Sequence, residues 1–161
     1  MRVSQALDVA APRQAVWDWV SDPARYLHFM SGITRWQVDG TRARGLGARY
    51  RMLMRVGSAE IGGLIEVVEF DAPCELAWTS VTGVDQRGRW RLRAVSDDRT
   101  RVELRLAYGI PNSGVGGWLA ERASAPMVTG NLRRSLAQLE RTLRHEQLRE
   151  AAARRRAGAV S

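Results

Sequence analysis

A few side chains of this sequence carry groups that could act as a general acid or base. Tyr50 and Tyr108 offer phenol hydroxyls, Glu69 offers a carboxylate, and His28 offers an imidazole. Such groups assist enolisation or dehydration when they face a substrate inside a water-poor cavity. These residues are therefore the catalytic candidates, and the surrounding elements decide whether they face one site.

The segment 65–78 leaves the position of its carboxylates open. Glu66 and Glu69 have opposite phases in a strand, so one of them could face inward. A bulge at Val67-Val68 would change which one, and the sequence does not decide between them. An inward glutamate would have a raised pKa and could act as a base. An outward glutamate paired with neighbouring arginines is the more ordinary arrangement. His28, near the expected cavity mouth, is more often a surface or packing residue than a base.

The sequence indicates no metal and no cofactor. His28, His145 and Cys74 are too far apart to show metal-ligand spacing. No P-loop, dinucleotide glycine pattern or Ser-His-Asp order occurs. The glycine-rich segment 110–118 favours a flexible lid at the end of a cavity instead.

Residues 87–93, RGRWRLR, resemble a nucleic-acid-binding segment, because four arginines surround Trp90. The arginines occupy odd positions, however, and Gly88, Trp90 and Leu92 occupy even ones. This alternation predicts a strand with one wet face and one dry face. Trp90 then points away from the arginines, so the two cannot form a stacking platform, and nucleic acid is an unfavoured partner.

The same period of two recurs through the middle of the chain, between helical patterns at both ends. The order predicts an α+β fold, in which an antiparallel sheet packs against a long amphipathic helix. The predicted helix carries one apolar stripe, Val128, Leu132, Leu136, Leu139 and Leu143, and Pro126 is expected to start or kink it. The expected strands are 3–9, 34–40, 48–56, 59–70, 74–82, 87–95 and 100–108, with short helices at 11–20 and 23–30.

The side chains that face the space between sheet and helix are large, soft and aromatic. Methionine and tryptophan adapt to flexible apolar ligands, although the same residues could simply pack a solid core. The candidate ligand-binding residues are Phe29, Trp36, Tyr50, Met52, Met54, Trp78, Ser80, Trp90, Leu92, Leu104, Leu106, Tyr108, Met127 and Leu132.

Three motifs carry a family resemblance: VWDWVSDPARYLHFMSGI (16–33), GLGARYRM (45–52) and IEVVEFDAPCELAW (65–78). Over residues 3–145 the sequence resembles the START-like (SRPBCC) superfamily, and within it the polyketide cyclase/dehydrase and lipid-transport branch. The resemblance implies a helix-grip fold: a seven-stranded antiparallel sheet curled around a long C-terminal helix, two short helices after the first strand, and a deep apolar cavity. It implies a domain at 1–145 and a basic, partly helical or disordered extension at 146–161.

Members of this superfamily bind lipids, sterols, polyketides, quinones or plant hormones, and some catalyse ring closure and dehydration. Three functions stay open: a carrier or sequestering domain for a hydrophobic small molecule, a polyketide cyclase/dehydrase-type enzyme, and a basic module for nucleic acid or a membrane surface. Membership of the superfamily predicts the fold and the cavity of a protein better than it predicts the reaction.

Composition sets the remaining limits. The chain has 161 residues and a net charge of +8, and all 25 basic residues are arginine. No apolar run suits a membrane span and no leader pattern occurs, so a cytoplasmic location is the default expectation. The tail at Arg154–Arg156 could make weak contact with an anionic membrane. The oligomeric state is left open.

Overall fold

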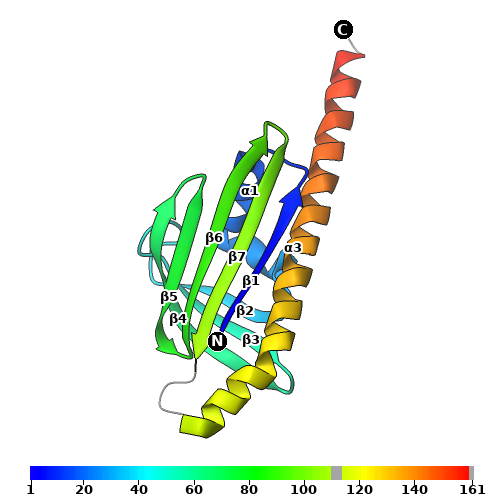
Figure 1. Ribbon diagram of the computed structural model, residues 1–161. Helices are drawn as coiled ribbons and strands as arrows, with labels where there is room; N and C mark the ends of the chain where they lie inside the picture. Colours follow the sequence, from blue (N-terminus) through cyan, green and yellow to red (C-terminus); the bar gives the residue numbers. More distant parts are fainter. Residues whose placement is uncertain (110–113, 160–161) are drawn as a thin grey trace.

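The structure, a computed structural model, describes the backbone of residues 1–109 and 114–159, and the side chains of 1–109 and 122–159. Figure 1 shows a curled sheet with the short helices behind it and one long helix along its side. The elements in chain order are β1 (Arg2–Val9), α1 (Arg13–Val20), the 3-10 turn η1 (Pro23–Arg25), α2 (Tyr26–Phe29), β2 (Ile33–Asp39), β3 (Arg49–Val56), β4 (Ala59–Asp71), β5 (Glu75–Gly83), β6 (Asp85–Ser96), β7 (Arg99–Gly109) and α3 (Gly114–Gly158).

The sheet has seven strands in the order β1-β7-β6-β5-β4-β3-β2, and every neighbouring pair is antiparallel. From β2 to β7, each strand pairs with the next strand in the sequence, and β1 lies at the edge of the sheet beside β7. This arrangement confirms the predicted helix-grip architecture, with two short helices following the first strand.

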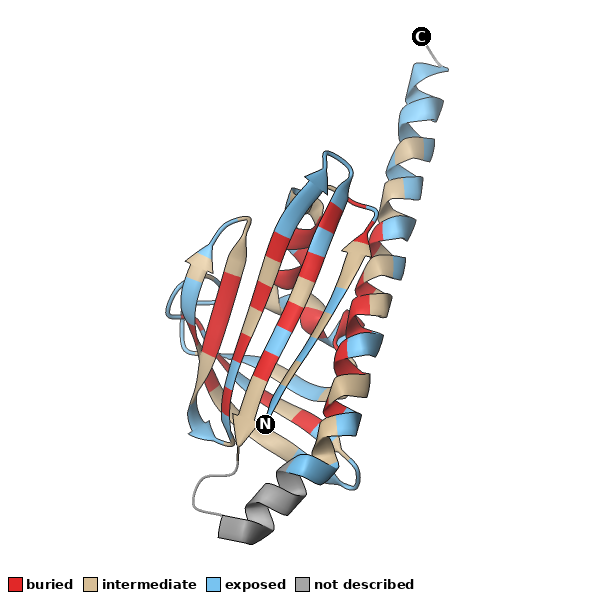
Figure 2. Cartoon of the chain, viewed as in Figure 1, coloured by how far each residue is buried: buried red, intermediate tan, exposed pale blue. Residues whose placement is uncertain are grey.

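Alternation along the strands divides wet from dry side chains, as predicted for residues 87–93. Trp90 and Leu92 are buried, with exposed fractions of 0% and 3%, whereas their arginine neighbours remain partly or fully exposed. The alternate red and pale bands on the strands of Figure 2 show the same pattern. The inward side chains and the helices therefore enclose the core.

Helix α3 is 45 residues long, and its apolar stripe faces the core. Each residue of the stripe from Val128 to Leu143 is at most 2% exposed. Pro126 lies inside the helix and does not start it, because the helical backbone begins at Gly114. Residues 114–118 of the predicted lid are thus helical, and 110–113 lie outside the described residues.

The C-terminal part of α3 extends beyond the sheet in Figure 1. The helix continues through Gly158, so the described part of the predicted extension is helical. None of the helices in the described ranges is long and apolar enough to cross a membrane.

Strand β4 contains the irregularity that decides the positions of its glutamates. Val67 lies opposite Trp78 and Glu69 lies opposite Ala77, so Val68 is an extra residue in the ladder. The bulge puts both Glu66 and Glu69 on the outer face. The sequence left their orientation open and favoured an outward glutamate paired with arginine. That arrangement holds for both residues, because Arg49 donates to Glu66 at 2.6 Å and Arg89 donates to Glu69 at 2.7 Å.

Candidate functional site

Three small voids lie in a row between the sheet and the helices. The central void, of about 20 Å³, is bordered by Tyr26 of α2, by Leu132 of α3, and by side chains of five strands. A second void, of about 10 Å³, lies toward Ser21 and Tyr50. A third, of about 30 Å³, lies toward Tyr108 and Val128.

The three voids are neighbours because they share lining side chains. Trp36 and Trp78 border both the central and the second void. Met52 and Met54 border both the central and the third void. The interior is therefore one elongated space that these side chains divide.

The resemblance implied a deep cavity, and the structure shows a largely filled interior. Trp78 is 7% exposed, and Met52 and Met54 are 5% and 7% exposed. Voids of about 10–30 Å³ hold at most about one or two water molecules each, so none of them accommodates a hydrophobic ligand in this conformation. Long and aromatic side chains occupy the space that smaller residues would have left open.

A cluster of aromatic rings forms the wall nearest α2. The rings of Tyr26 and Trp36 stack with centroids 4.3 Å apart. Trp36 also stacks on Tyr50, at 5.2 Å. Offset stacking of this kind gives a rigid flat surface at one side of the divided space.

The indole N–H groups of this region differ in whether they have an acceptor. Trp90 donates to the Tyr26 hydroxyl at 3.0 Å, and that hydroxyl donates in turn to the Val20 carbonyl at 2.5 Å. The Nε1 atoms of Trp36 and Trp78 are buried and have no acceptor among the described residues. Buried donors are nearly always paired with protein or with ordered water, so these two N–H groups are available to an acceptor that enters the voids.

The buried tyrosines of this wall do not supply a base near neutral pH. Burial raises the pKa of Tyr50 to about 12, although nearby Arg44 opposes the shift. Burial also raises the pKa of Tyr26, further than for Tyr50. The Tyr50 hydroxyl donates to the Ala43 carbonyl at 2.9 Å, so its proton is already engaged.

The structure does not bring the catalytic candidates together. Tyr50 borders the second void and Tyr108 the third. Glu69 lies on the outer face, where Arg89 donates to it at 2.7 Å, and His28 is exposed to solvent. No carboxylate or imidazole of the described residues lines any of the three voids. Glu69 and His28 thus lie on the surface, the arrangement that the sequence favoured for each over a role as a base.

The candidate ligand-binding residues fall into two groups. One group packs elsewhere: Phe29, Trp90 and Leu92 lie in the solid core, the Ser80 hydroxyl contacts Asp85 and the Gln86 amide, and Met127 is 44% exposed beside Gly57. The other group lines the voids: Trp36, Tyr50, Met52, Met54, Trp78, Leu104, Leu106, Tyr108 and Leu132.

Sequence reasoning missed a buried polar side chain in this interior. Gln86 is 7% exposed and borders the central and third voids. Its Nε2 atom lies 3.1 Å from the Met52 sulfur, a weak acceptor. The signal was available, because Gln86 shares the inward phase of Gly88 and Trp90.

The curled antiparallel sheet and the long helix packed against it define the helix-grip fold. The chain matches the model of the family described as polyketide cyclase/dehydrase and lipid transport over residues 1–144, and it belongs to that family. A search of curated proteins finds no match.

Solved structures agree with this assignment at the level of the fold. The chain is similar to a protein from Thermus thermophilus, with a TM-score of 0.76 and 20% identity, over 91% of this chain and 99% of that one. For the Zhui aromatase/cyclase from a Streptomyces species the TM-score is 0.69 at 19% identity, over 94% and 95% of the two chains. For a START superfamily protein from Mycobacterium smegmatis it is 0.63 at 20% identity, over 91% and 98%. Identities this low establish the fold alone.

Proposed function

We propose that the chain binds a hydrophobic small molecule, lipid-like or polyketide-like, between the sheet and α3, and carries or sequesters it. Membership of the family supports this proposal, as does the apolar lining of the three voids. Apolar pockets with a few placed polar groups are the usual form of a small-molecule site.

The observation that carries the proposal is the pair of unpaired indole N–H groups. Trp36 and Trp78 border the same two voids, and each has a buried Nε1 atom without an acceptor among the described residues. Leaving a buried donor unpaired costs about 1–3 kcal/mol. An oxygen of a bound ligand would satisfy one of these donors. The proposed ligand is therefore apolar in body and carries a hydrogen-bond acceptor such as a carbonyl.

Binding requires that the divided space becomes continuous. Met52 and Met54 stand between the central and third voids, and methionine has an unbranched, flexible side chain. Rotation of these side chains would join the voids without moving the backbone of the sheet. In this proposal, the present positions of Met52 and Met54 are those that keep the voids separate.

The chemistry of the lining favours binding over catalysis. No carboxylate or imidazole of the described residues borders the voids, and the hydroxyls of Tyr26 and Tyr50 donate to backbone carbonyls. An enzyme of the cyclase type would need an acid or base in the cavity. No observation of the structure gives the enzymatic alternative comparable support.

Calorimetric titration with two matched neutral probes, 2-acetylnaphthalene and 2-ethylnaphthalene, tests the proposal. The probes have nearly the same shape, and only the first has a carbonyl acceptor. We expect the wild-type protein to bind the carbonyl probe about tenfold more tightly, because one charge-free hydrogen bond contributes about 1 kcal/mol or more. Trp36→Phe and Trp78→Phe each remove one of the two donors, and the substitution of the tryptophan that binds the carbonyl should remove most of this preference.

Trp17→Phe is the matched control. Trp17 lies in α1, where it is buried against Phe70 of β4, and it borders none of the three voids. This variant should keep the preference. The proposal would be contradicted if neither probe showed saturable binding. It would also be contradicted if the ratio of the two probe affinities were the same in the wild type and in every variant.

A further inference from the structure

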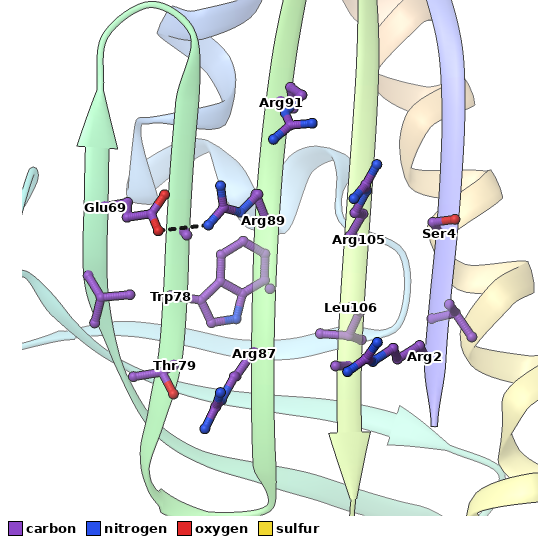
Figure 3. A pocket seen from close by; sticks show the side chains of 15 residues that line it. Arg2, Ser4, Glu69, Trp78, Thr79, Arg87, Arg89, Arg91, Arg105 and Leu106 are labelled. Carbon is purple, nitrogen blue, oxygen red and sulfur yellow. Dashed lines mark hydrogen bonds and ion pairs between the residues drawn. The ribbon is translucent and has the colours of Figure 1, made fainter.

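The outer face of the sheet contains an open hollow of about 830 Å³, on the opposite side from the three voids. Its floor is formed by β1, β7, β6 and β5, and Figure 3 shows arginine side chains rising around it. The arginines that line it are Arg2, Arg87, Arg89, Arg91 and Arg105.

Ion pairs neutralise part of this arginine cluster. Arg89 and Arg91 both donate to Glu75, at 2.6 and 2.7 Å. Arg105 pairs with Glu103 at 2.8 Å. These arginines therefore have acidic partners within the sheet, and they contribute little uncompensated charge.

Arg2 and Arg87 differ from their neighbours in the hollow. Among the described residues neither side chain has an ion pair or a hydrogen bond. Both residues lie directly opposite Ala107, Arg2 on one side and Arg87 on the other. Strands lie about 4.8 Å apart, so the two Cα atoms are about 10 Å apart with only a methyl group between them.

The neighbourhood of this pair adds a hydrogen-bond donor. Thr79 lies opposite Arg87 on β5, and its side chain lines the same hollow. In Figure 3 the Arg2 side chain lies over β7, toward the side on which Arg87 and Thr79 stand. The Arg87 guanidinium and the Thr79 hydroxyl thus lie together on one side of Ala107, and the Arg2 guanidinium lies on the other.

We propose that Arg2 and Arg87, with Thr79, form a binding site for the phosphate group of a small ligand. Guanidinium groups bind phosphate oxygens in a bidentate manner, with both geometric and charge complementarity. A dianionic phosphate matches the two uncompensated cations, whereas one carboxylate would leave a positive charge. A second copy of the chain is a poor occupant, because it would bring the same uncompensated arginines together.

The test is a calorimetric titration of the full chain with inorganic pyrophosphate at an ionic strength of about 0.1 M, where the Debye length is about 10 Å. Arg87→Gln removes one guanidinium of the site, and Arg2→Gln removes the other. We expect each variant to weaken pyrophosphate binding about tenfold, the effect of losing a charge-assisted hydrogen bond. Because both side chains lie on the surface, thermal unfolding should remain close to that of the wild type.

Arg93→Gln is the matched control for this experiment. Arg93 lies on the same strand and the same face as Arg87, is exposed, and has no ion pair among the described residues, but it does not line the hollow. The control should change pyrophosphate affinity less than about twofold, because charge effects away from a contact are screened in salt. Equal losses in Arg87→Gln and Arg93→Gln, or no saturable pyrophosphate binding by the wild type, would overturn the proposal.

Two further titrations identify the source of the phosphate. Vesicles of phosphatidylcholine with phosphatidate present the group on a membrane, and glycerol phosphate presents it in solution. Binding of the vesicles or of glycerol phosphate that is lost in Arg87→Gln and kept in Arg93→Gln supports the site. The titration in which this happens shows whether the phosphate group comes from a membrane or from solution. Binding of duplex DNA that both variants weaken equally would indicate general attraction by the +8 charge and would contradict a specific site. Because the interior probes are uncharged, failure here leaves the interior binding proposal unaffected.

Discussion

Trp78 connects the interior of the protein with its outer surface. It borders the central void on one side and the outer hollow on the other. The residue opposite it on β6 is Gly88, whose missing side chain leaves room for the indole ring. A β-carbon at that glycine would lie 1.9 Å from an indole carbon, so the position of the ring depends on the absence of a side chain.

Gly88→Ala should therefore destabilise the protein by about 1–3 kcal/mol, because the added methyl group overpacks a tight contact. Chemical denaturation followed by circular dichroism measures this change. The double variant Gly88→Ala/Trp78→Leu should recover part of the loss, since the smaller side chain yields the space. A Gly88→Ala variant as stable as the wild type would contradict this, because it would mean that the Trp78 indole can adopt another position without loss of stability.

The tyrosines give the stability of the protein a dependence on high pH. Burial raises the pKa of Tyr50 from 10.0 to about 12. Between these values the tyrosine of the unfolded chain ionises while the folded one keeps its proton. The contribution of Tyr50 to stability is thus complete below pH 10 and decreases as the pH rises toward 12.

Tyr50→Phe should make the decrease in the free energy of unfolding between pH 10 and 12 less steep. The variant also loses the hydrogen bond to Ala43, which lowers its stability by a similar amount at every pH below 10. Urea denaturation at several pH values separates the constant offset from the slope. Parallel curves for the variant and the wild type would contradict the raised pKa.

At the scale of elements, α3 is held to the rest of the fold at more than its apolar stripe. Trp19 of α1 donates from its indole nitrogen to Glu146 at 2.8 Å. Arg25 lies over the same indole ring, at 4.7 Å from its centroid. Glu146, the first residue of the predicted extension, thus contacts the domain, and the exposed residues beyond it continue the helix to Gly158.

Glu146→Ala should lower the free energy of unfolding by about 1–2 kcal/mol, because the half-buried Trp19 N–H loses a charged acceptor. Glu150→Ala is the control, since this residue is exposed one turn further along the same helix. It should stay within about 0.5 kcal/mol of the wild type. Equal effects of the two substitutions would mean that the contact with Trp19 does not stabilise the docking of α3.

Element order and strand faces could be predicted from the sequence because alternation is a local property. Arg87 and Trp90 reveal their faces by their parity within one strand. The position of Glu69 could not be predicted in the same way, because the bulge at Val68 depends on how β4 meets β5. Likewise, Met127 lies within the helical pattern, but its exposed position depends on where the β3–β4 turn meets α3.

At the scale of the whole molecule, the same fold presents two faces with opposite chemistry. The inner face surrounds a divided apolar space with two unpaired indole donors, and the outer face carries arginines around an open hollow. Whether a helix-grip interior is open or filled depends on the volumes of side chains that meet from distant strands. The sequence could therefore predict many of the residues that line the interior, but not Gln86, and the residual volume required the packed structure.

A crystal structure of the full chain grown with saturating 2-acetylnaphthalene tests the central claim most directly. The account predicts the naphthalene rings between the sheet and α3, with Met52 or Met54 in a new rotamer and the carbonyl oxygen within about 3 Å of Nε1 of Trp36 or Trp78. An interior still filled by Met52, Met54 and Trp78 at saturating probe, with the molecule absent or bound only on the outer face, would contradict it.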